Sequence, residues 1–252
     1  MKIQYCSDLH LEFEENRKFL KTNPILPVGE ILLLAGDITL LRTKEESKDF
    51  FKYLSKNFKT VYWIPGNHEY YHSDIATIAL PLFENIFDNV FLLNNKTIIL
   101  EDVEIIFSTL WSNIPVQQEW TVQKSVSDFF YIKNNGKTIM PKDFNKLHET
   151  DLNFIKTEIS KPTSKRRIVV THHVPTFKHY PPQYKNSEIN GAFATELYDL
   201  IENSKIDYWL YGHHHCNVAD FKIGNTNMIT NQLGYVKEKE NLLFSREKII
   251  EF

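Results

Sequence analysis

Five short apolar segments of this sequence each end in Asp, Asn or His side chains, and this repeated arrangement constrains the fold more than any other feature. In the clearest case, residues 61–64 form an apolar run that predicts a buried strand, and Pro65–Gly66 ends it with turn chemistry. Asn67, His68 and Glu69 follow at once. Because the ends of core strands are where a rigid backbone can present polar groups, this arrangement indicates a site in a layered α/β or sandwich fold.

The other four segments repeat the arrangement at different points of the chain. They comprise residues 2–6, 31–35, 167–171 and 207–211, which are mostly apolar or β-branched. Residues 31–35 are apolar throughout, which is typical of a strand that is covered on both faces. The polar residues found at the five segment ends are Asp8, His10, Asp37, Asn67, His68, His172, His173, His213, His214 and His215.

The order of the expected elements favours an α/β sandwich over a single wound parallel sheet. The first half of the chain reads as strand, helix, strand, helix and strand, followed by consecutive strands up to residue 108. Residues 12–29 are charged and contain proline, so they predict a loop with at most one helical turn. Helices are expected at residues 44–57, where Thr43 and Glu46 would form a capping box, and at 73–83, 143–159 and 193–203. Residues 218–252 predict a β-rich meander.

Two segments lack the pattern of short apolar strands. Residues 111–150 are rich in aromatic side chains, which predict either a helical satellite core or a cap over the site that selects substrates. Residues 176–191 predict a long loop, and loops of this length are often functional. The 252 residues fit a single domain with residues 111–150 as a candidate cap or insert, since no repeat or linker divides the chain.

Composition excludes several classes of protein. The net charge of −3 provides no global basic field of the kind that marks nucleic-acid binders. No apolar run approaches the roughly 20 residues that span a membrane, and the N-terminus leads straight into a strand without the pattern of a signal peptide. Cys6 and Cys216 are too few for a disulfide framework and are expected to be reduced packing residues. We therefore expect a cytoplasmic protein.

The residue types at the segment ends indicate metal binding. Imidazole together with carboxylate suits zinc, iron or manganese rather than calcium, and the lack of nearby Cys pairs argues against a zinc finger. The candidate ligands are too many for one tetrahedral ion, so two ions that share a carboxylate fit better. Such a pair clamps the oxygens of a displacement at phosphorus, and a bridging hydroxide supplies a nucleophile at neutral pH.

The sequence resembles the calcineurin-like metallophosphoesterase superfamily in motifs that follow one another in the same order. These motifs are Asp8-x-His10, Gly36-Asp37, Gly66-Asn67-His68-Glu69, His172 and Gly212-His213-x-His215. The match extends from residue 8 to residue 215, and all the motifs in order, each after an apolar segment, are highly specific. The resemblance implies a four-layer α-β-β-α sandwich of two mixed sheets, with a dinuclear metal site at the strand ends.

The resemblance also implies a role for each motif residue. Asp37 would bridge two divalent or trivalent ions of manganese, iron or zinc, and His68 would lie beside them as the general acid that protonates the departing oxygen. The metal ligands carried over by the resemblance are Asp8, His10 and His215 for the first ion and Asn67, His172 and His213 for the second.

Several neighbouring residues are expected to have other roles. His173 is expected to pack or to hydrogen-bond behind the ligands, and His214 to point away from the ions because it lies between two ligands on an extended segment. Glu69 is expected to be structural and to orient His68. Asn231 and Tyr235 resemble a late segment of bacterial members that returns to the site. The sequence leaves open whether His72 and His179 line the cleft.

The chain departs from the protein Ser/Thr phosphatases of the superfamily. Residues 38–40 lack the Asp and Arg that follow Gly-Asp in that branch, and Pro65 stands in place of its Arg. We expect an enzyme closer to the small bacterial members, which hydrolyses a small phosphodiester or phosphomonoester. The alternatives are an inactive metal-binding scaffold that acts through a protein partner, and a nucleotide or nucleic-acid phosphodiesterase suggested only by Arg166–Arg167 and scattered lysines.

Overall fold

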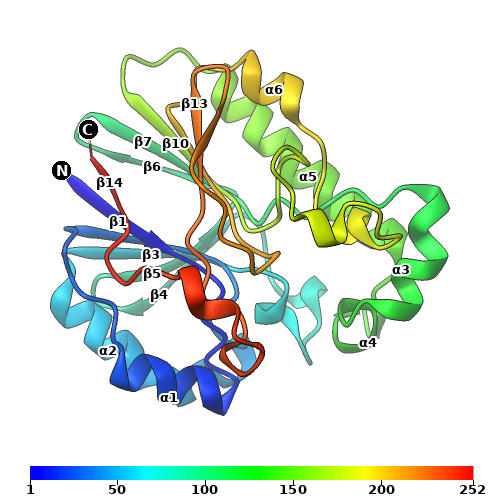
Figure 1. Ribbon diagram of the computed structural model, residues 1–252, viewed down its shortest axis with the longest axis horizontal. Helices are drawn as coiled ribbons and strands as arrows, with labels where there is room; N and C mark the ends of the chain where they lie inside the picture. The colour runs from blue at the N-terminus through cyan, green and yellow to red at the C-terminus, as the bar shows by residue number, and fades with distance from the viewer. Residues whose placement is uncertain (252) are drawn as a thin grey trace.

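Two apolar segments of the sequence, residues 31–35 and 60–64, form the central strands of a six-stranded sheet in the computed structural model, which describes residues 1–251 (Figure 1). In order across this first sheet, the strands are β14 (Ile249–Glu251), β1 (Lys2–Cys6), β2 (Ile31–Ala35), β3 (Thr60–Ile64), β5 (Val90–Asn94) and β4 (Leu82–Phe87). Strands β1, β2, β3 and β5 are parallel, so the polar residues after β1, β2 and β3 emerge at one edge.

A second six-stranded sheet packs face to face against the first (Figure 1). Its strands, in order, are β12 (Phe221–Ile223), β13 (Thr226–Ile229), β11 (Tyr208–Leu210), β10 (Arg166–Val170), β7 (Val103–Phe107) and β6 (Lys96–Leu100). Strands β7, β10, β11 and β13 are parallel, and the edge strands β6 and β12 are antiparallel to their neighbours. Both sheets are therefore mixed.

Helices cover the outer faces of both sheets. In Figure 1, α1 (Glu14–Thr22) and α2 (Lys48–Asn57) lie below the first sheet, and α5 (Pro141–Ser160) and α6 (Tyr198–Glu202) lie beyond the second. This arrangement confirms the four-layer α-β-β-α sandwich. The remaining helices and the hairpin are α3 (Glu119–Ser125), α4 (Asp128–Tyr131), β8 (Lys133–Asn134) and β9 (Lys137–Thr138). The 3-10 turns are η1 (Leu41–Ser47), η2 (His68–Tyr70), η3 (Ile75–Thr77), η4 (Val116–Gln118), η5 (Pro182–Tyr184), η6 (Asn190–Ala192), η7 (Val236–Glu238) and η8 (Glu240–Leu243).

The core explains why residues 31–35 are apolar without alternation. Leu33 faces the second sheet and packs in the core between the sheets, whereas Leu32 and Leu34 face the helices and pack with Phe51 and Trp63. Removing each such leucine from water contributes about 2 kcal/mol. A strand with both faces buried needs apolar residues at every position, and its rigidity holds Asp37 directly beyond its end.

Helix α1 lies where the sequence predicted a loop. The prolines of this region, at positions 24 and 27, follow the helix rather than interrupt it. Residues 14–22 have Glu14 and Glu15 in the first turn. Leu20 packs in the core outside the first sheet, and Asn16 donates to the carbonyl oxygens of Leu9 and Gly234. The expectation of a loop at residues 12–29 was therefore wrong for these nine residues.

The helix predicted at residues 73–83 is also wrong. Only η3 forms there, and residues 82–87 instead pair antiparallel with β5 as the edge strand β4. Phe83 stacks on Phe91 of β5 with 5.4 Å between ring centroids. Tertiary pairing therefore overrides the helical spacing of the apolar residues.

Two other helix boundaries differ from the prediction. The capping box of Thr43 and Glu46 does not form, because Thr43 lies inside η1 with non-helical backbone angles, and α2 begins only at Lys48. Helix α6 is limited to residues 198–202, because the backbone of residues 193–197 hydrogen-bonds to the segment after β10 instead.

The C-terminal residues do not form a simple meander. Turns η7 and η8 separate β13 from β14, and β14 crosses to the first sheet, where it pairs antiparallel with β1. The expected end of this strand at Phe252 lies outside the described residues. Among residues 1–251, no helix combines the length and the apolar character that a membrane crossing requires.

Candidate metal centre

Five of the expected ligands lie on residues with left-handed backbone, directly after β1, β2 and β11. The φ angles of Asp8, His10, Asp37, His213 and His215 lie between 47° and 79°. Such angles are uncommon for residues other than glycine and cost on the order of 1–3 kcal/mol each. The fold compensates this strain at one edge of the two sheets, which is typical of a functional site.

The first ligand cluster comprises Asp8, His10, Asp37 and His215, whose donor atoms all lie within 4.8 Å of one another. His10 Nε2 is 2.9 Å from His215 Nε2, and His215 Nε2 is 3.4 Å from Asp8 Oδ1. Asp37 Oδ2 lies 3.7 Å from His10 Nε2. These four side chains are the set expected for the first ion together with its bridging carboxylate.

The second cluster lies on the other side of Asp37. His172 Nε2 is 3.4 Å from Asp37 Oδ1, 3.1 Å from His213 Nδ1 and 3.1 Å from Asn67 Oδ1. The two oxygens of Asp37 thus approach different histidine clusters, which is the geometry expected of a bridging carboxylate. His172 Nδ1 donates to the carbonyl oxygen of Ala35 at 2.9 Å, so its Nε2 presents a lone pair to the cluster.

The hydrogen bonds behind the first cluster set the tautomers of its histidines. His10 Nδ1 donates to Glu12 Oε1 at 3.0 Å, and His215 Nδ1 donates to Glu240 Oε2 at 2.8 Å. Because carboxylates only accept, the proton of each neutral imidazole lies on Nδ1. Two Nε2 lone pairs then face each other at 2.9 Å, which is repulsive unless a proton or a metal ion lies between them. The residues therefore fit bound metal ions.

Glycine at two positions leaves room for the ligands. A Cβ at Gly66 would overlap the carboxylate of Asp37 and the imidazole of His172. A Cβ at Gly212 would meet the side chains of Asp8 and Ser7. The close approach of backbone to ligand at the strand ends explains why these two glycines precede ligands.

Comparison with known proteins agrees with this geometry. Residues 1–217 match the family described as calcineurin-like phosphoesterase. The chain belongs to this family. It is 34% identical over 268 residues to uncharacterized protein L509 of Acanthamoeba polyphaga mimivirus, a match that covers 95% of this chain and 93% of that protein. Its fold resembles the crystal structure of phosphopantetheinyl hydrolase from Mycobacterium tuberculosis, with a TM-score of 0.74, 14% identity and coverage of 99% of this chain and 95% of that one.

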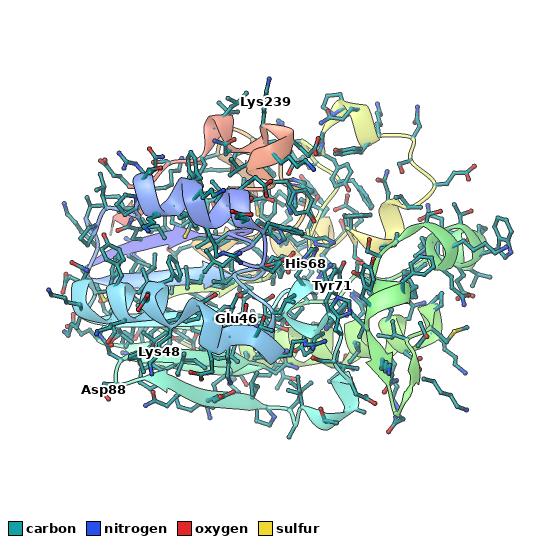
Figure 2. The ribbon with its side chains drawn as sticks, turned by 90° about the horizontal axis from the view of Figure 1, so that it is seen from below. Glu46, Lys48, His68, Tyr71, Asp88 and Lys239 are labelled. Atoms are coloured by element: carbon teal, nitrogen blue, oxygen red, sulfur yellow. The ribbon has the colours of Figure 1, made fainter. Side chains whose placement is uncertain are left out.

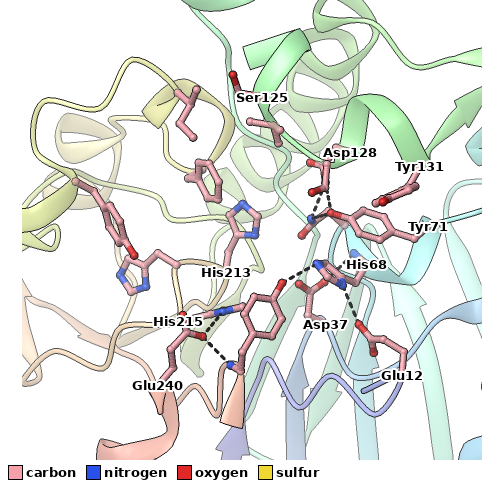
Figure 3. Close-up of a pocket in the computed structure, with 18 of the residues that line it drawn as sticks. Glu12, Asp37, His68, Tyr71, Ser125, Asp128, Tyr131, His213, His215 and Glu240 are labelled. Atoms are coloured by element: carbon pink, nitrogen blue, oxygen red, sulfur yellow. Dashed lines mark hydrogen bonds and ion pairs between the residues drawn. The ribbon is translucent and has the colours of Figure 1, made fainter. Parts of the chain in front are cut away.

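Membership confirms the resemblance seen in the sequence and indicates a metal-dependent phosphoesterase. In this phosphoesterase, Asp128 of α4 sets the orientation of the side-chain amide of Asn67. Asn67 Nδ2 donates to Asp128 Oδ1 at 2.8 Å, and the hydroxyl of Tyr71 donates to the same oxygen at 2.7 Å (Figure 3). A carboxylate accepts only from the nitrogen end of an amide, so Asn67 Oδ1 is turned toward the second cluster.

His68 lies beside both clusters without belonging to the two sets assigned to the ions. Its Nδ1 donates to Glu12 Oε1 at 2.8 Å, its ring stacks on Tyr71, and its Nε2 lies 3.3 Å from the hydroxyl of Tyr235 (Figures 2 and 3). Burial alone would lower the pKa of His68, but the carboxylates of Asp37 and Glu12 outweigh that effect and raise it.

Glu69 organises the backbone rather than the ring of His68. Its carboxylate accepts from the backbone N–H groups of Asp37, Ile38 and Gly66 at 2.9, 2.7 and 2.6 Å, and from Trp63 Nε1 at 3.0 Å. Glu69 therefore ties the loop after β2 to the loop after β3, which sets the position of Asp37 relative to Asn67.

The remaining histidines lie outside the two ligand sets. His173 is buried against Trp111 and against the ring of His213, and His214 hydrogen-bonds with Gln232. His72 lines the cavity beside the site, whereas His179 packs on Phe221.

The two residues of the late segment differ in their placement. Tyr235 reaches the site, and its ring contacts those of His10 and His215. Asn231 instead donates to the carbonyl oxygens of Tyr5 and Ser245 and supports the backbone. Cys6 and Cys216 are free thiols.

Three acidic residues of the site were not predicted from the sequence: Glu12, Asp128 and Glu240. Glu12 continues the alternation of Asp8-x-His10, and this spacing was a usable signal. Asp128 and Glu240 lie on separate segments with no motif around them, so only folding brings them to their partners.

A cavity of about 650 Å³ opens in front of the clusters (Figure 3). Asp37, Asn67 and His68 line its floor. Residues of segments 111–150 and 176–191, which lacked the pattern of strands in the sequence, line its walls. Segment 111–150 contributes Asp128 and Tyr131 among others, and Figure 3 shows both pointing toward the site.

Proposed function

We propose that this protein is a dinuclear metal-dependent phosphoesterase that hydrolyses a small phosphodiester or phosphomonoester, with His68 as general acid. The observation that carries the proposal is Asp37, which turns one oxygen toward each of two clusters whose unprotonated nitrogens converge. Two bound ions supply Lewis acidity at the phosphoryl oxygens and lower the pKa of water, which provides a nucleophile near neutral pH.

Hydrogen bonds within the chain orient the ligating histidines and the general acid. Glu12, Glu240 and the carbonyl of Ala35 hold the Nδ1 protons of three ligating histidines, so that each Nε2 is available as a donor. Glu12 accepts from His10 and from His68 with the same oxygen, which places the general acid at a set distance from a ligand.

His68 is suited to protonate a departing oxygen. With Nδ1 bound to Glu12, a protonated His68 keeps its Nε2–H, and Nε2 lies on the cavity side near Tyr235. The carboxylates of Asp37 and Glu12 raise the pKa of His68 against the effect of burial, so they favour the protonated form that a general acid needs.

The proposal is tested by metal analysis of protein purified without chelator, followed by turnover of bis-p-nitrophenyl phosphate and p-nitrophenyl phosphate with manganese. His68→Ala should reduce turnover and leave the metal content unchanged. His179→Ala is the matched control, because His179 packs on Phe221 away from the clusters, and it should retain activity. Metal-loaded protein without turnover of either ester would contradict an enzyme and favour a scaffold.

The residues that suggested a nucleic-acid substrate are engaged within the fold. Arg167 is buried and pairs with Glu104 at 2.6 Å, and Arg166 pairs with Asp207 at 2.9 Å. Their charges are therefore compensated at the second sheet, and no specific observation supports a nucleic-acid phosphodiesterase.

A further inference from the structure

The charge of the cavity distinguishes between phosphoester classes. Its lining includes the carboxylates of Glu12, Asp128 and Glu240 in addition to Asp37, and none of the described lining residues is Lys or Arg. Sites that hold a phosphate dianion usually grip it with Arg or Lys. In this cavity the bound ions and a protonated His68 would be the positive charges offered to a substrate.

Two of these carboxylates have an oxygen without a hydrogen-bond partner. Glu12 Oε2 and Asp128 Oδ2 are both buried and have no hydrogen-bond partner among the described residues. The other oxygen of Glu12 accepts from His68, and the other oxygen of Asp128 accepts from Asn67. Burial and the hydrogen bonds to His68 and Asn67 hold both carboxyl groups in place next to the cavity. Each additional negative charge on a substrate is therefore unfavourable beside them.

Half of the remaining lining residues are aliphatic, Phe or Tyr. Segment 111–150 and the loop at 176–191 provide five of these residues, and the other five come from elsewhere in the chain. The apolar and aromatic lining residues are Phe13, Leu40, Tyr71, Val126, Tyr131, Tyr180, Tyr184, Ile189, Phe193 and Tyr235. Such walls favour an uncharged, apolar or aromatic group on the substrate.

A phosphodiester carries one negative charge, whereas a phosphomonoester carries about 1.5 to 2 near pH 7. We infer that this site selects phosphodiester monoanions with an uncharged apolar or aromatic ester group and discriminates against phosphomonoester dianions. The inference rests on the proposed function and narrows its substrate class.

Two pairs of variants isolate the two parts of the inference. Ser127→Lys adds a cation at an exposed position of the cavity wall, and Ser160→Lys adds the same charge at the exposed end of α5, outside the lining. Tyr131→Ala removes an aromatic wall, and Phe130→Ala removes its exposed neighbour in α4, which is not part of the lining.

Three substrates that share the p-nitrophenolate leaving group separate the effect of substrate charge from the effect of apolar contact. They are p-nitrophenyl phosphate, methyl p-nitrophenyl phosphate and phenyl p-nitrophenyl phosphate, assayed with manganese-loaded protein. We expect KM to be lowest for the phenyl diester and highest for the monoester. Ser127→Lys should lower KM for the monoester about tenfold and change KM for the methyl diester less than about twofold.

Tyr131→Ala should raise KM for the phenyl diester about tenfold more than for the methyl diester. Ser160→Lys and Phe130→Ala should leave all three KM values unchanged. A monoester KM equal to or below both diester values, or equal effects of Ser127→Lys and Ser160→Lys, would overturn the inference while leaving a phosphoesterase. Absence of turnover of all three esters by metal-loaded protein would instead contradict the proposed function, and the inference with it.

Discussion

The carboxylate of Asp128 accepts a hydrogen bond from the side-chain amide of Asn67 at 2.8 Å, across 61 positions of sequence. Only the oxygen end of an amide has lone pairs for a cation, and this contact holds the nitrogen end on Asp128, so that the oxygen is already turned toward the second cluster. A short helix of segment 111–150 thereby takes part in the metal centre, in addition to lining the cavity.

Replacing Asp128 should therefore weaken the binding of the second ion selectively. Asp128→Ala is expected to lower the affinity for the second ion about 10- to 100-fold and to leave the first ion bound. Titration of metal-free protein with manganese, read as stoichiometry and dissociation constants, measures this. Asp151→Asn is the matched control, since Asp151 is equally buried but hydrogen-bonds with Asn95 and Trp111. Equal loss of both ions would contradict the assigned role.

Metal binding should stabilise the fold, because the facing Nε2 atoms of His10 and His215 lie 2.9 Å apart. Manganese at 100 times its dissociation constant is expected to raise the free energy of unfolding by about 2.7 kcal/mol for each independent ion. Thermal unfolding with chelator and with manganese measures the effect. Calcium, which prefers oxygen ligands, should give a much smaller shift, and an equal shift would argue against these histidines as ligands.

Gly66→Ala should prevent metal binding while the protein still folds. The added methyl group would overlap the carboxylate of Asp37 and the ring of His172, so the bridging position is lost. Metal analysis together with the Tm checks this. Gly136→Ala serves as the control: its Cβ would meet no atom within 4 Å, and its positive φ of 77° makes the variant strained. That variant should lose about 1 kcal/mol of stability and keep both ions.

The stability of the protein should depend on Asp151 in a defined pH range. Burial raises the pKa of Asp151 from 3.8 to about 6, so its ionisation destabilises the folded state as the pH rises between these values. The Tm of Asp151→Asn minus that of the wild type should therefore increase from pH 4 to pH 6 and level off above it. Thermal unfolding in the presence of chelator measures this difference, and a flat difference would show that the carboxyl group does not titrate there.

The role of His68 predicts a dependence on the leaving group. His68→Ala should reduce kcat/KM by about 10²- to 10⁴-fold for a phenyl or alkyl ester, whose departing oxygen needs a proton. The loss should be smaller for p-nitrophenyl esters, because p-nitrophenolate leaves without one. Equal losses for both leaving groups would indicate that His68 positions the substrate rather than protonating it.

The strands and the metal-ligand motifs could be predicted from the sequence because their signals are local. An apolar run such as residues 31–35 predicts its own strand, and a ligand directly beyond it, such as Asp37, is carried to the sheet edge by that strand. Helical spacing was less reliable. Residues 73–83 have apolar residues at helical intervals, but pairing with β5 determined the structure of the strand that begins at residue 82.

The sequence by itself determined which side chains could bind metal and in what order they occur, since both follow from short motifs. Only the tertiary structure decided how those side chains are oriented. Asp128 reaches Asn67 across 61 positions and Glu240 reaches His215 across 25, and nothing near either acid in the chain indicates its partner. Hydrogen bonds between distant segments depend on how the whole chain packs, so the tautomers and the amide orientation at the metal centre became visible only in the folded protein.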